Sequence, residues 1–249
     1  MISGIIVIPA FNEMDSLPQL LGELVPELTS RDMIIVVDDS NPASATMTED
    51  RCRTVVVNAE CQITFIKSAS KGGRGGAVRR GFVYAINTCP NAHKFLECDA
   101  DGSHRANDIL GIYKSDSISD LLVGSRYLQS SKIIGWSFSR RLQSRILNAL
   151  IPRILRLPLT DITNGLRRYS RRAVEELLSF DPKSSGFIYL SEQAVIVHQS
   201  QLTIEEVPII FAERRAGVSS VTSSELRHSL VGLLNISRHR KQLGTARTE

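Results

Sequence analysis

Short apolar runs alternate with helical patterns through the first half of the chain, and few folds accommodate such an order. The runs show no polar alternation and occupy residues 5–8, 33–37, 63–66, 95–98 and 121–123. Strands that are apolar on both faces belong to a parallel sheet that helices cover on both sides. Apolar residues at helical spacing, such as Leu17, Leu20 and Leu21, lie between the runs. We therefore expect an α/β fold, a three-layer α/β/α sandwich with a mostly parallel central sheet.

The second half of the chain has a different pattern. Residues 136–157 form a basic amphipathic stretch with roughly helical spacing, which Pro152 is expected to bend or break. A helix is predicted at 171–178, and an edge strand at 202–211, where Pro208 disfavours a central position. Leu226, Leu230, Leu233 and Leu234 share one face of a last predicted helix, and residues 238–249 form a polar tail.

The net charge of +4 conceals an uneven distribution. Residues 132–172 hold ten basic side chains and one acidic side chain, Asp161, for a net charge of +9, so the rest of the chain carries −5. A focused positive surface attracts phosphate, anionic lipid or nucleic acid. Aromatic residues make up only 6% of the chain, and its remainder is acidic, so we expect no nucleic-acid partner.

The composition, 42% apolar and 22% charged, excludes a disordered or collagen-like chain. The cysteines, Cys52, Cys61, Cys89 and Cys98, form no C-x-x-C pair, which argues against a zinc site or a disulfide framework. The chain shows neither a signal-like start nor a run of the ~18–20 apolar residues that a membrane span needs. We expect a cytoplasmic protein whose contact with the membrane is peripheral, at the cytoplasmic face.

Carboxylates follow three of the predicted strands at the point where each ends. Glu13 follows the first strand, Asp38 and Asp39 end the second, and Asp99 and Asp101 follow the fourth. Ligands of open α/β sheets bind outside the carboxyl ends of the strands, so these side chains should share one edge. A single carboxylate there is commonly a helix cap, whereas three clusters indicate a binding site.

Asp99-Ala100-Asp101 is the sharpest of these motifs. Alternate carboxylates leaving a strand suit one hard divalent cation, Mg²⁺ or Mn²⁺, which could bridge a diphosphate. Ser103 could supply a further oxygen ligand. His104 is interpreted as a surface or supporting histidine rather than as a ligand.

The loop Lys71-Gly72-Gly73-Arg74-Gly75-Gly76 separates the third strand from its helix. Its backbone N–H groups and its two cations, Lys71 and Arg74, could cover phosphates. The loop is not a Walker A motif, because the lysine precedes the glycines, and Val78 breaks a dinucleotide motif. A plain mobile turn explains the composition equally well.

Several motifs stand in the order of one enzyme family along nearly the whole chain. They are Pro9 to Glu13, Val37 to Ser40, Asp99 to His104, Gly124 to Tyr127, Gly135-Trp136 with Arg140, Arg141 and Ser144, Asp161 to Arg167, Gly186-Phe187, Glu206 to Ile209, and Arg214 to Ser219. With these motifs the chain resembles the family 2 glycosyltransferases, and within them the polyprenol-phosphate (dolichol-phosphate) mannosyltransferase-like group.

The resemblance implies a fold and a division of the chain. The implied fold is of the GT-A type, Rossmann-like, with C-terminal amphipathic helices. The catalytic domain would span residues 1–220, with a nucleotide-sugar half over about 1–127 and an acceptor half over about 128–220. An amphipathic helix and the polar tail would follow at 221–249.

The resemblance also implies roles for the residues that match its motifs. Pro9, Phe11 and Glu13 would line the nucleoside, and Val37 and Asp39 would hold the base or the ribose. Asp99 and Ala100 would lie by the donor sugar and its diphosphate, with Arg214 on the phosphates and Lys71 of the glycine-rich loop beside them. Asp101 would bind the metal, with Ser103, where the family often has Gln, ligating through water. Arg126, Arg140 and Ser144 would receive the acceptor phosphate.

Asp99, Asp101, Arg126 and Arg214 are thus the implied catalytic residues. The chain departs from the family pattern at Ser220, where the family has Lys, and in Ser40-Asn41-Pro42, which lacks the usual Gly. The loss of that lysine removes one phosphate partner, which leaves open a nucleotide-sugar sensor without activity.

The implied reaction is a metal-dependent, inverting transfer of a hexose of the mannose or glucose type. The donor would be GDP-mannose or a UDP-hexose, and the acceptor a polyprenyl phosphate at the membrane surface. A phosphate acceptor is already an anion, so it needs positioning by arginines and no general base. The alternative is a soluble hydroxyl acceptor, a natural product or a polysaccharide, which demands a base; Glu192 is the candidate, followed by Asp161.

Overall fold

The computed structural model describes residues 1–68, 72–180, 188–213 and 232–238. Within them, seven strands form one sheet in the order β3-β2-β1-β4-β7-β5-β8. The strands are β1 (Gly4–Ala10), β2 (Asp32–Asp38), β3 (Gln62–Lys67), β4 (Lys94–Glu97), β5 (Leu121–Ser125), β7 (Arg167–Ser170) and β8 (Ile204–Pro208). A small second sheet joins β6 (Lys132–Ile133) to β9 (Ile210–Phe211).

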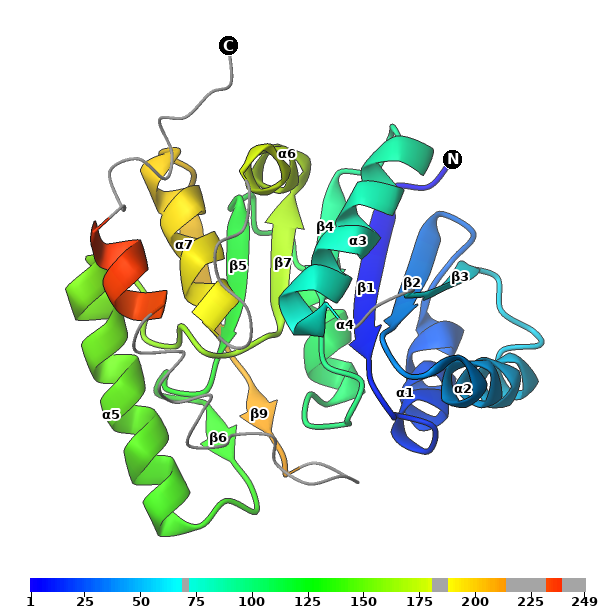
Figure 1. The fold of residues 1–249 in the computed structure, drawn as a ribbon, viewed down its shortest axis with the longest axis horizontal. Helices are drawn as coiled ribbons and strands as arrows, with labels where there is room; N and C mark the ends of the chain where they lie inside the picture. Colours follow the sequence, from blue (N-terminus) through cyan, green and yellow to red (C-terminus); the bar gives the residue numbers. More distant parts are fainter. Residues whose placement is uncertain (69–71, 181–187, 214–231, 239–249) are drawn as a thin grey trace.

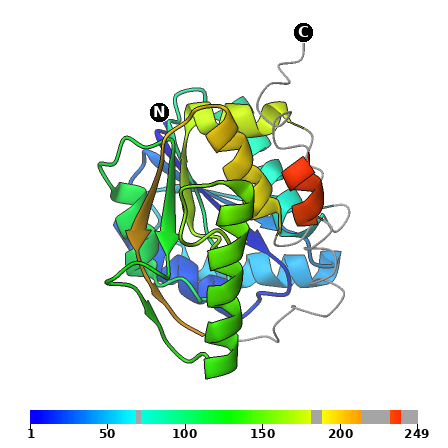
Figure 2. The same cartoon turned by 90° about the vertical axis from the view of Figure 1, so that its left-hand side faces the viewer.

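Helices cover both faces of the main sheet (Figure 1). On one face lie α3 (Gly73–Thr88), α6 (Arg171–Ser179) and α7 (Tyr189–Gln199). On the other lie α1 (Ser16–Leu24), α2 (Pro42–Val55) and α4 (Ala106–Lys114). The long helix α5 (Phe138–Leu155) stands at one side of the molecule, as the view in Figure 2 makes plain. The expected three-layer α/β/α fold is confirmed.

Alternate residues of the central strands point to opposite faces of the sheet and pack into the two halves of the core. Ile5 and Val7 of β1 pack under α3, whereas Ile6 and Ile8 pack on the α1 side. All four are fully buried. This two-sided burial is the reason that the strand sequences carry no polar alternation.

β7 is a strand that the apolar pattern did not predict. It runs antiparallel to both of its neighbours, β4 and β5, in an otherwise parallel sheet. Its sequence begins with two arginines, and both are buried. Arg167 donates to the carbonyl oxygens of Leu190 at 2.7 Å, Ile162 at 2.6 Å and Asn164 at 3.0 Å. Arg168 donates to two carbonyls of the loop after α4.

These two arginines correct the interpretation of residues 132–172 as one focused positive surface. Arg167 and Arg168 satisfy backbone carbonyls inside the fold, because a buried cation needs such partners. They therefore add nothing to the outer surface, and the exposed basic residues of this stretch are found mainly on α5.

Several expected elements differ from the observed ones in detail. Helix α2 was not expected, since its only buried residues are Ala45, Thr48 and Cys52, and its start is marked only by the Asn41 cap and Pro42. Pro152 does not break α5, which continues to Leu155 and ends at Arg156 in a left-handed conformation. Pro152 lies in the last turn, and its missing N–H deprives only the Asn148 carbonyl of a helical donor.

The predicted edge strand is confirmed, because β8 lies at the border of the sheet and ends at Pro208. Of the last predicted helix, residues 232–238 are helical, with Leu233 buried and Leu234 exposed. Leu226 and Leu230 lie outside the described residues, as does the tail from residue 239.

Removal of the buried charge of Arg167 tests its structural role. In Arg167→Met, three buried carbonyls lose their donors, so we expect the free energy of unfolding to fall by roughly 3–5 kcal/mol. Urea denaturation measures this change. The matched control, Arg172→Met, alters an exposed arginine of α6 and should stay within about 0.5 kcal/mol of the wild type. Equal losses in the two variants would contradict the assignment.

Candidate active site

The carboxyl ends of β1, β2, β4 and β5 meet at one edge of the main sheet. Ala10 of β1 pairs with Asp38 of β2, and the Asp39 N–H donates to the Ala10 carbonyl at 2.9 Å. Glu97 ends β4 two positions before Asp99. The prediction that these carboxylates share an edge is therefore confirmed.

The loops after β1 and β2 are tied together. The Asn12 N–H donates to the Ser40 hydroxyl at 2.8 Å, and the Ser40 N–H donates to Asp38 Oδ1 at 2.8 Å. Asn12 has a φ of 59°, a conformation that asparagine tolerates well. This geometry leaves the ring of Phe11 half-exposed above the edge, beside Glu13, whose carboxylate accepts from the Ser16 hydroxyl.

The Asp39 carboxylate anchors the glycine-rich loop. It accepts from the Ser68 hydroxyl at 2.5 Å, from the Gly72 N–H at 2.9 Å and from the guanidinium of Arg80. Asp39 itself is buried. The residue expected to hold a base or ribose thus also fixes both ends of the segment that contains Lys71, which lies outside the described residues.

Arg74 was expected to be an open cation of the loop, but its guanidinium binds two carboxylates. Its guanidinium donates to Asp99 Oδ1 at 2.6 Å, to Glu97 Oε2 at 2.7 Å and to the Gly165 carbonyl at 2.8 Å. It also packs over the ring of Tyr189, 5.5 Å from the centroid. Arg74 is therefore a buried bridge between two carboxylates, and the expectation that it covers phosphates as an open cation is wrong.

Glycines make room for this bridge. A Cβ on Gly75 would come within 2.8 Å of the Tyr189 ring, and a Cβ on Gly165 would collide with the Arg74 guanidinium. Gly75 of the loop and Gly165 before β7 therefore make room for Tyr189 and Arg74, respectively.

Glu97 is fully buried at the end of β4. Burial raises the pKa of its carboxyl above the ordinary value, and the charges of Arg74 and Arg167 offset part of that rise. Its oxygens accept from Tyr169 at 2.7 Å and from Tyr189 at 2.5 Å, in addition to Arg74. Four elements, α3, β4, β7 and α7, therefore meet at this carboxylate.

His104 holds the backbone of Asp99. The Asp99 N–H donates to His104 Nδ1 at 3.2 Å, so the other ring nitrogen carries the proton and donates to Asn164 Oδ1 at 2.8 Å. His104 is buried, as expected for a supporting histidine and not for one at the surface. Asn164 in turn donates to the Gly124 carbonyl, at the end of β5.

Asp101 and Ser103 offer oxygen atoms suited to a hard cation. Both residues are buried, and the Ser103 N–H donates to Asp101 Oδ1 at 3.0 Å. The Ser103 hydroxyl is buried with no hydrogen-bond partner among the described residues, and a bound ligand would supply one. The described residues contain no cluster of three His, Cys, Asp or Glu side chains able to hold a metal. This donor set fits Mg²⁺ or Mn²⁺ shared with substrate phosphates, and not an all-protein cage.

Arg126 and Asp161 form a second buried ion pair on the acceptor side. Arg126 Nε and Nη2 donate to the two carboxylate oxygens at 2.7 and 2.8 Å, and the Arg126 N–H adds a third bond at 2.9 Å. Burial lowers the pKa of Arg126, but the charge and the hydrogen bonds of Asp161, helped by the charges of Tyr127 and Asp99, together raise it above its ordinary value. Asp161 is fully buried and engaged in this pair, which makes it a poor general base.

Of the three residues expected to receive an acceptor phosphate, Arg126 and Arg140 contact Trp136, and Ser144 is bonded to Tyr127. Arg126 and Arg140 both pack over the Trp136 ring, 5.4 and 4.1 Å from the centroid. The Ser144 hydroxyl accepts from Tyr127 at 2.6 Å, and Tyr127 follows Arg126 directly. The residues are therefore linked in the fold, and their role toward an acceptor phosphate stays a prediction.

Asn148 links α5 to this group. It donates to the Ser144 carbonyl and to the Thr163 hydroxyl, both at 2.9 Å, and Thr163 accepts from Arg126 at 2.6 Å. Glu192, the other candidate base, is buried in the first turn of α7. Arg214 and Ser220 lie outside the described residues.

Arg80, Glu97 and Asn148 are site residues that sequence reasoning missed. For Glu97 a signal existed, because an acidic residue within the buried run 95–98 demands a partner. Asn148 likewise interrupts an apolar helix face. Nothing in the sequence separated Arg80 from the adjacent Arg79.

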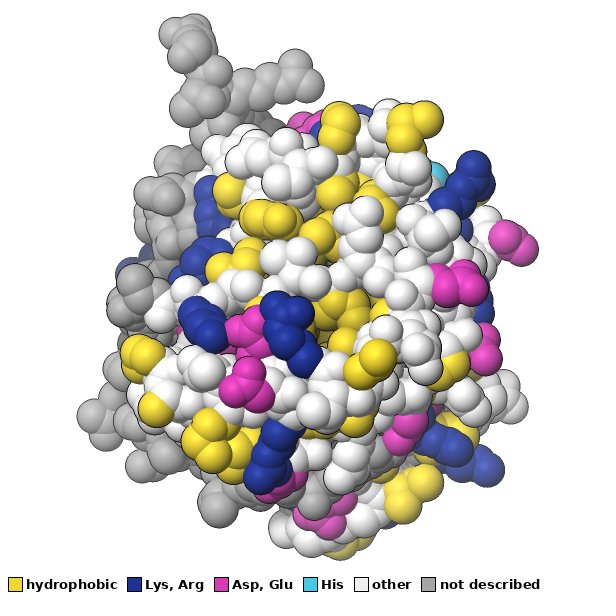
Figure 3. Space-filling view, turned by 90° about the vertical axis from the view of Figure 1, so that its right-hand side faces the viewer, with side chains coloured by type: hydrophobic (Ala, Val, Ile, Leu, Met, Phe, Trp, Pro, Cys, Tyr) yellow, Lys and Arg dark blue, Asp and Glu magenta, His cyan; other side chains and the backbone are white. Residues whose placement is uncertain are grey.

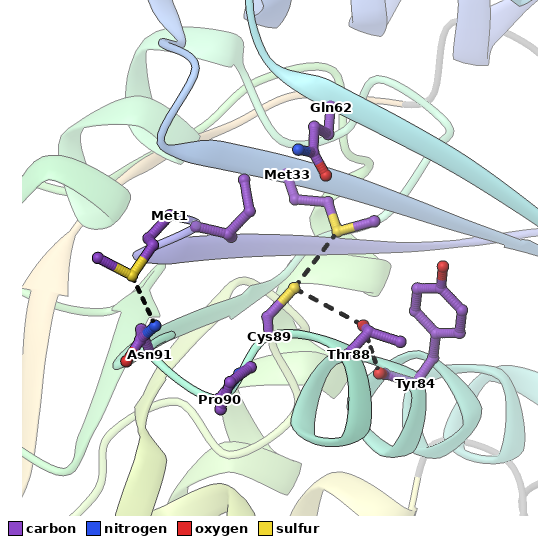
Figure 4. Close-up of a pocket in the computed structure, with 9 residues that line it drawn as sticks. Met1, Met33, Gln62, Tyr84, Thr88, Cys89, Pro90 and Asn91 are labelled. Atoms are coloured by element: carbon purple, nitrogen blue, oxygen red, sulfur yellow. Dashed lines mark hydrogen bonds between the residues drawn. The ribbon is translucent and has the colours of Figure 1, made fainter.

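A cavity of about 300 Å³ lies at the opposite ends of the strands (Figure 4). It is lined by residues at the amino ends of β1, β2 and β3 and at the end of α3, such as Ile2, Met33, Gln62 and Cys89. Its lining has no charged side chain, so it offers no acid, base or phosphate ligand. The carboxylates and arginines suited to a reaction lie instead at the carboxyl ends of the strands.

Relatives of known activity resemble this chain over most of its length. It is 28% identical over 227 residues to the polyprenol monophosphomannose synthase of Mycolicibacterium smegmatis, covering 91% of this chain and 83% of the relative. It is 31% identical over 228 residues to the undecaprenyl-phosphate mannosyltransferase of Micrococcus luteus, covering 91% and 90%.

Two solved structures share the fold. One is glucosyl-3-phosphoglycerate synthase from Mycobacterium tuberculosis in complex with Mn²⁺, UDP-glucose and phosphoglyceric acid, with a TM-score of 0.60, 17% identity and coverage of 95% of this chain and 80% of that one. The other is a mannosyltransferase from Pyrobaculum calidifontis in complex with GDP-Man and Mn²⁺, with a TM-score of 0.61, 14% identity and coverage of 97% and 70%. These likenesses confirm the GT-A-type fold.

The family itself is settled by the sequence match. The profile of glycosyl transferase family 2 matches residues 5–178, well over half of the chain, and the strand ends that carry Asp39, Asp99 and Asp101 fall within it. The chain therefore belongs to glycosyl transferase family 2 and is a glycosyltransferase.

Proposed function

We propose that the enzyme transfers a hexosyl group, of the mannose or glucose type, from a nucleoside diphosphate sugar to a polyprenyl phosphate with inversion. In one in-line step an acceptor phosphate oxygen forms a bond to the anomeric carbon, while the bond from that carbon to the diphosphate breaks. The nucleoside diphosphate leaves with the electron pair. No proton has to be removed from a phosphate anion.

The observation that carries the proposal is the packing of Arg126 and Arg140 over the ring of Trp136, with the Ser144 hydroxyl bonded to Tyr127, the residue after Arg126. Two cations beside a hydroxyl suit an acceptor phosphate. The relatives named above act, by their names, on polyprenyl phosphates, which supports the same acceptor class here.

On the donor side, Asp101 and Ser103 would hold a divalent cation. When bound, the cation supplies positive charge to the departing diphosphate. Phe11 and the Asp39 loop would receive the nucleoside, with Arg214 and Lys71 on the phosphates. Asp99, fixed by Arg74 and His104, would contact the donor sugar.

A hydroxyl acceptor is the alternative, and it requires a base. Asp161 is committed to Arg126, which leaves Glu192 as the remaining candidate. No helix of the described residues is long and apolar enough to cross a membrane. A polyprenyl phosphate would therefore be met through a surface of the protein at the membrane.

The direct experiment incubates the purified protein with Mn²⁺ or Mg²⁺, GDP-mannose or UDP-glucose, and a short polyprenyl phosphate. We expect a polyprenyl phosphate hexose with at least one donor, identified by mass spectrometry. No lipid-linked product with any donor, together with transfer to soluble hydroxyl acceptors, would refute the proposed acceptor.

Asp101→Asn tests the metal site without relying on turnover. We expect Mn²⁺-dependent nucleoside diphosphate binding, measured by calorimetry, to weaken about tenfold or more, and transfer to fall roughly 100-fold. Asp116→Asn, at an exposed position, is the matched control and should bind normally. Unchanged Mn²⁺-dependent binding in Asp101→Asn would remove Asp101 from the metal site.

Arg74→Lys tests whether Arg74 positions Asp99. A lysine cannot bond Asp99, Glu97 and the Gly165 carbonyl together, so kcat at saturating donor should fall by about 10- to 100-fold. Arg79→Lys in the same helix is the control, because Arg79 donates only to carbonyls of α6 among the described residues. Its variant should keep kcat, whatever the change in stability from the lost bonds to α6. A similar kcat in both variants would assign Arg74 a structural role alone.

Glu192→Gln separates the two acceptor classes. With a polyprenyl phosphate acceptor we expect kcat to change by less than about fivefold, whereas loss of a general base costs 100-fold or more. Donor binding, followed by calorimetry, should be intact in either case. Abolished transfer with intact donor binding would favour the hydroxyl acceptor.

A further inference from the structure

Three buried side-chain atoms have no hydrogen-bond partner within the described part of the chain. They are Arg80 Nε, Ser103 Oγ and Trp136 Nε1. The Arg80 guanidinium bonds Asp39 through another nitrogen, and Ser103 belongs to the proposed metal site. The indole N–H of Trp136 is the single polar group of its side chain. Buried donors are nearly always satisfied in native proteins, so a partner for this N–H, a ligand or a water, is expected.

The surroundings of Trp136 select the kind of partner. The guanidinium of Arg140 packs over its ring, 4.1 Å from the centroid, and the guanidinium of Arg126 lies 5.4 Å from the centroid. The tryptophan side chain is only 9% exposed. A group that accepts the indole hydrogen bond is therefore close to two cations in a place with little water. Such a place favours an anion over a neutral carbonyl or a water.

Both arginines can bind such an anion. Arg126 uses Nε and Nη2 for Asp161 and Thr163, and its Nη1 forms no hydrogen bond with the described residues. Arg140 Nη1 lies 3.7 Å from the Glu213 carboxylate, which is too long for a hydrogen bond. Both side chains of that second pair are partly exposed. An incoming anion can therefore compete with Glu213 for Arg140.

A phosphate monoester matches this set of donors. It has three terminal oxygens, whereas the phosphodiester product has two that bridge nothing. If the indole N–H holds one oxygen and the guanidiniums hold a second, the third is left for the bond to the anomeric carbon. The indole is a neutral donor, so it orients the phosphate without withdrawing further charge from the attacking oxygen.

Phe211 fixes the indole beside the donor half of the site. The rings of Phe211 and Trp136 meet edge to face with centroids 5.4 Å apart, and Phe211 meets His104 at the same distance. All three side chains are buried. His104 in turn accepts from the Asp99 N–H. The indole is thus packed against the loop after β4, which limits its freedom before any ligand binds.

An arginine that packs over an aromatic ring on the outer surface lacks these features. Basic, acidic and apolar side chains are interspersed on the face beside α2 and β3 (Figure 3). There Arg53 lies over the Phe65 ring, 5.4 Å from the centroid, and its charge is paired with Glu49. A phenyl ring has no hydrogen-bond donor. This pair is therefore a stacking contact alone and provides a control for Trp136.

We propose that the indole N–H of Trp136 donates a hydrogen bond to a terminal oxygen of the acceptor phosphate, while its ring holds the guanidiniums of Arg126 and Arg140 beside that phosphate. The inference rests on the proposed function and adds an acceptor-binding residue to it. During transfer a different phosphate oxygen forms the bond to the anomeric carbon, and the nucleoside diphosphate leaves with the electron pair of the broken bond. No proton moves at the indole.

The indole N–H can be observed directly, because Trp136 is the single tryptophan of the chain. In the ¹⁵N-labelled full chain, one indole cross-peak reports on it. We expect its proton resonance to move downfield, and its exchange with solvent to slow, when a short polyprenyl phosphate binds. The matching polyprenol, which lacks the phosphate, should cause no such shift. An unmoved resonance at an acceptor concentration that calorimetry shows to be saturating would overturn the inference.

Trp136→Phe removes the donor and keeps a ring for the arginines. We expect KM and the calorimetric Kd for a short polyprenyl phosphate to rise about tenfold, with kcat changed less than about threefold and Mn²⁺-dependent nucleoside diphosphate binding unchanged. Trp136→Leu removes the ring as well and should lower kcat/KM about 100-fold. Phe65→Leu, the control, removes the ring under Arg53 and should leave all these values unchanged. Equal acceptor affinity in Trp136→Phe and the wild type would contradict the inference.

The failures of the inference and of the proposed function can be told apart. Transfer to a polyprenyl phosphate with an unmoved indole resonance and a normal KM in Trp136→Phe refutes the inference alone. An indole shift with inorganic phosphate, but no transfer to any polyprenyl phosphate, refutes the proposed function and leaves the N–H as a donor to anions. The resonance is measured on the wild type, so this result stands even where a variant fails to fold.

Discussion

The carboxylate of Glu97 is fully buried at the end of the central strand β4, and Arg74 makes that burial possible. An unpaired charge at this place would cost several kcal/mol, whereas here the carboxylate accepts from one guanidinium and two tyrosine hydroxyls. Those partners come from α3, β7 and α7. The position of each of these elements is thereby tied to the same oxygen atoms.

The consequence for the site follows from the geometry of arginine. Its planar guanidinium reaches Glu97, Asp99 and the Gly165 carbonyl at once, which a lysine could not do. The packing of the sheet and the orientation of the Asp99 carboxylate are therefore set by one side chain. On the acceptor side, Arg126 and Asp161 likewise form a buried ion pair. Arg126 also donates to Thr163, and Thr163 accepts from Asn148 of α5, so the pair is linked to that helix.

The sequence predicted the parts of this structure that follow from local pattern. Five apolar runs predicted five strands, and the carboxylates at their ends were correctly placed at one edge. The partners of those carboxylates could not be predicted, because Arg74 and Glu97 are 23 residues apart and meet only in the folded sheet. For the same reason β7 was missed: Arg167 is compatible with a central strand only because three carbonyls from other segments surround it. Some arginines that were counted as surface charge are structural, and the exposed basic residues of this stretch lie mainly on α5.

In the function that we propose, one edge of the sheet holds the donor through Asp101 and the acceptor phosphate near Arg126 and Arg140. Anomalous diffraction at the manganese edge, from crystals grown with Mn²⁺, a nucleoside diphosphate and a short polyprenyl phosphate, tests it most directly. We expect a manganese peak at the Asp101 carboxylate and the diphosphate, with the acceptor phosphate beside Trp136 between Arg126 and Arg140. A manganese peak away from Asp101, or an acceptor phosphate bound elsewhere, would contradict it.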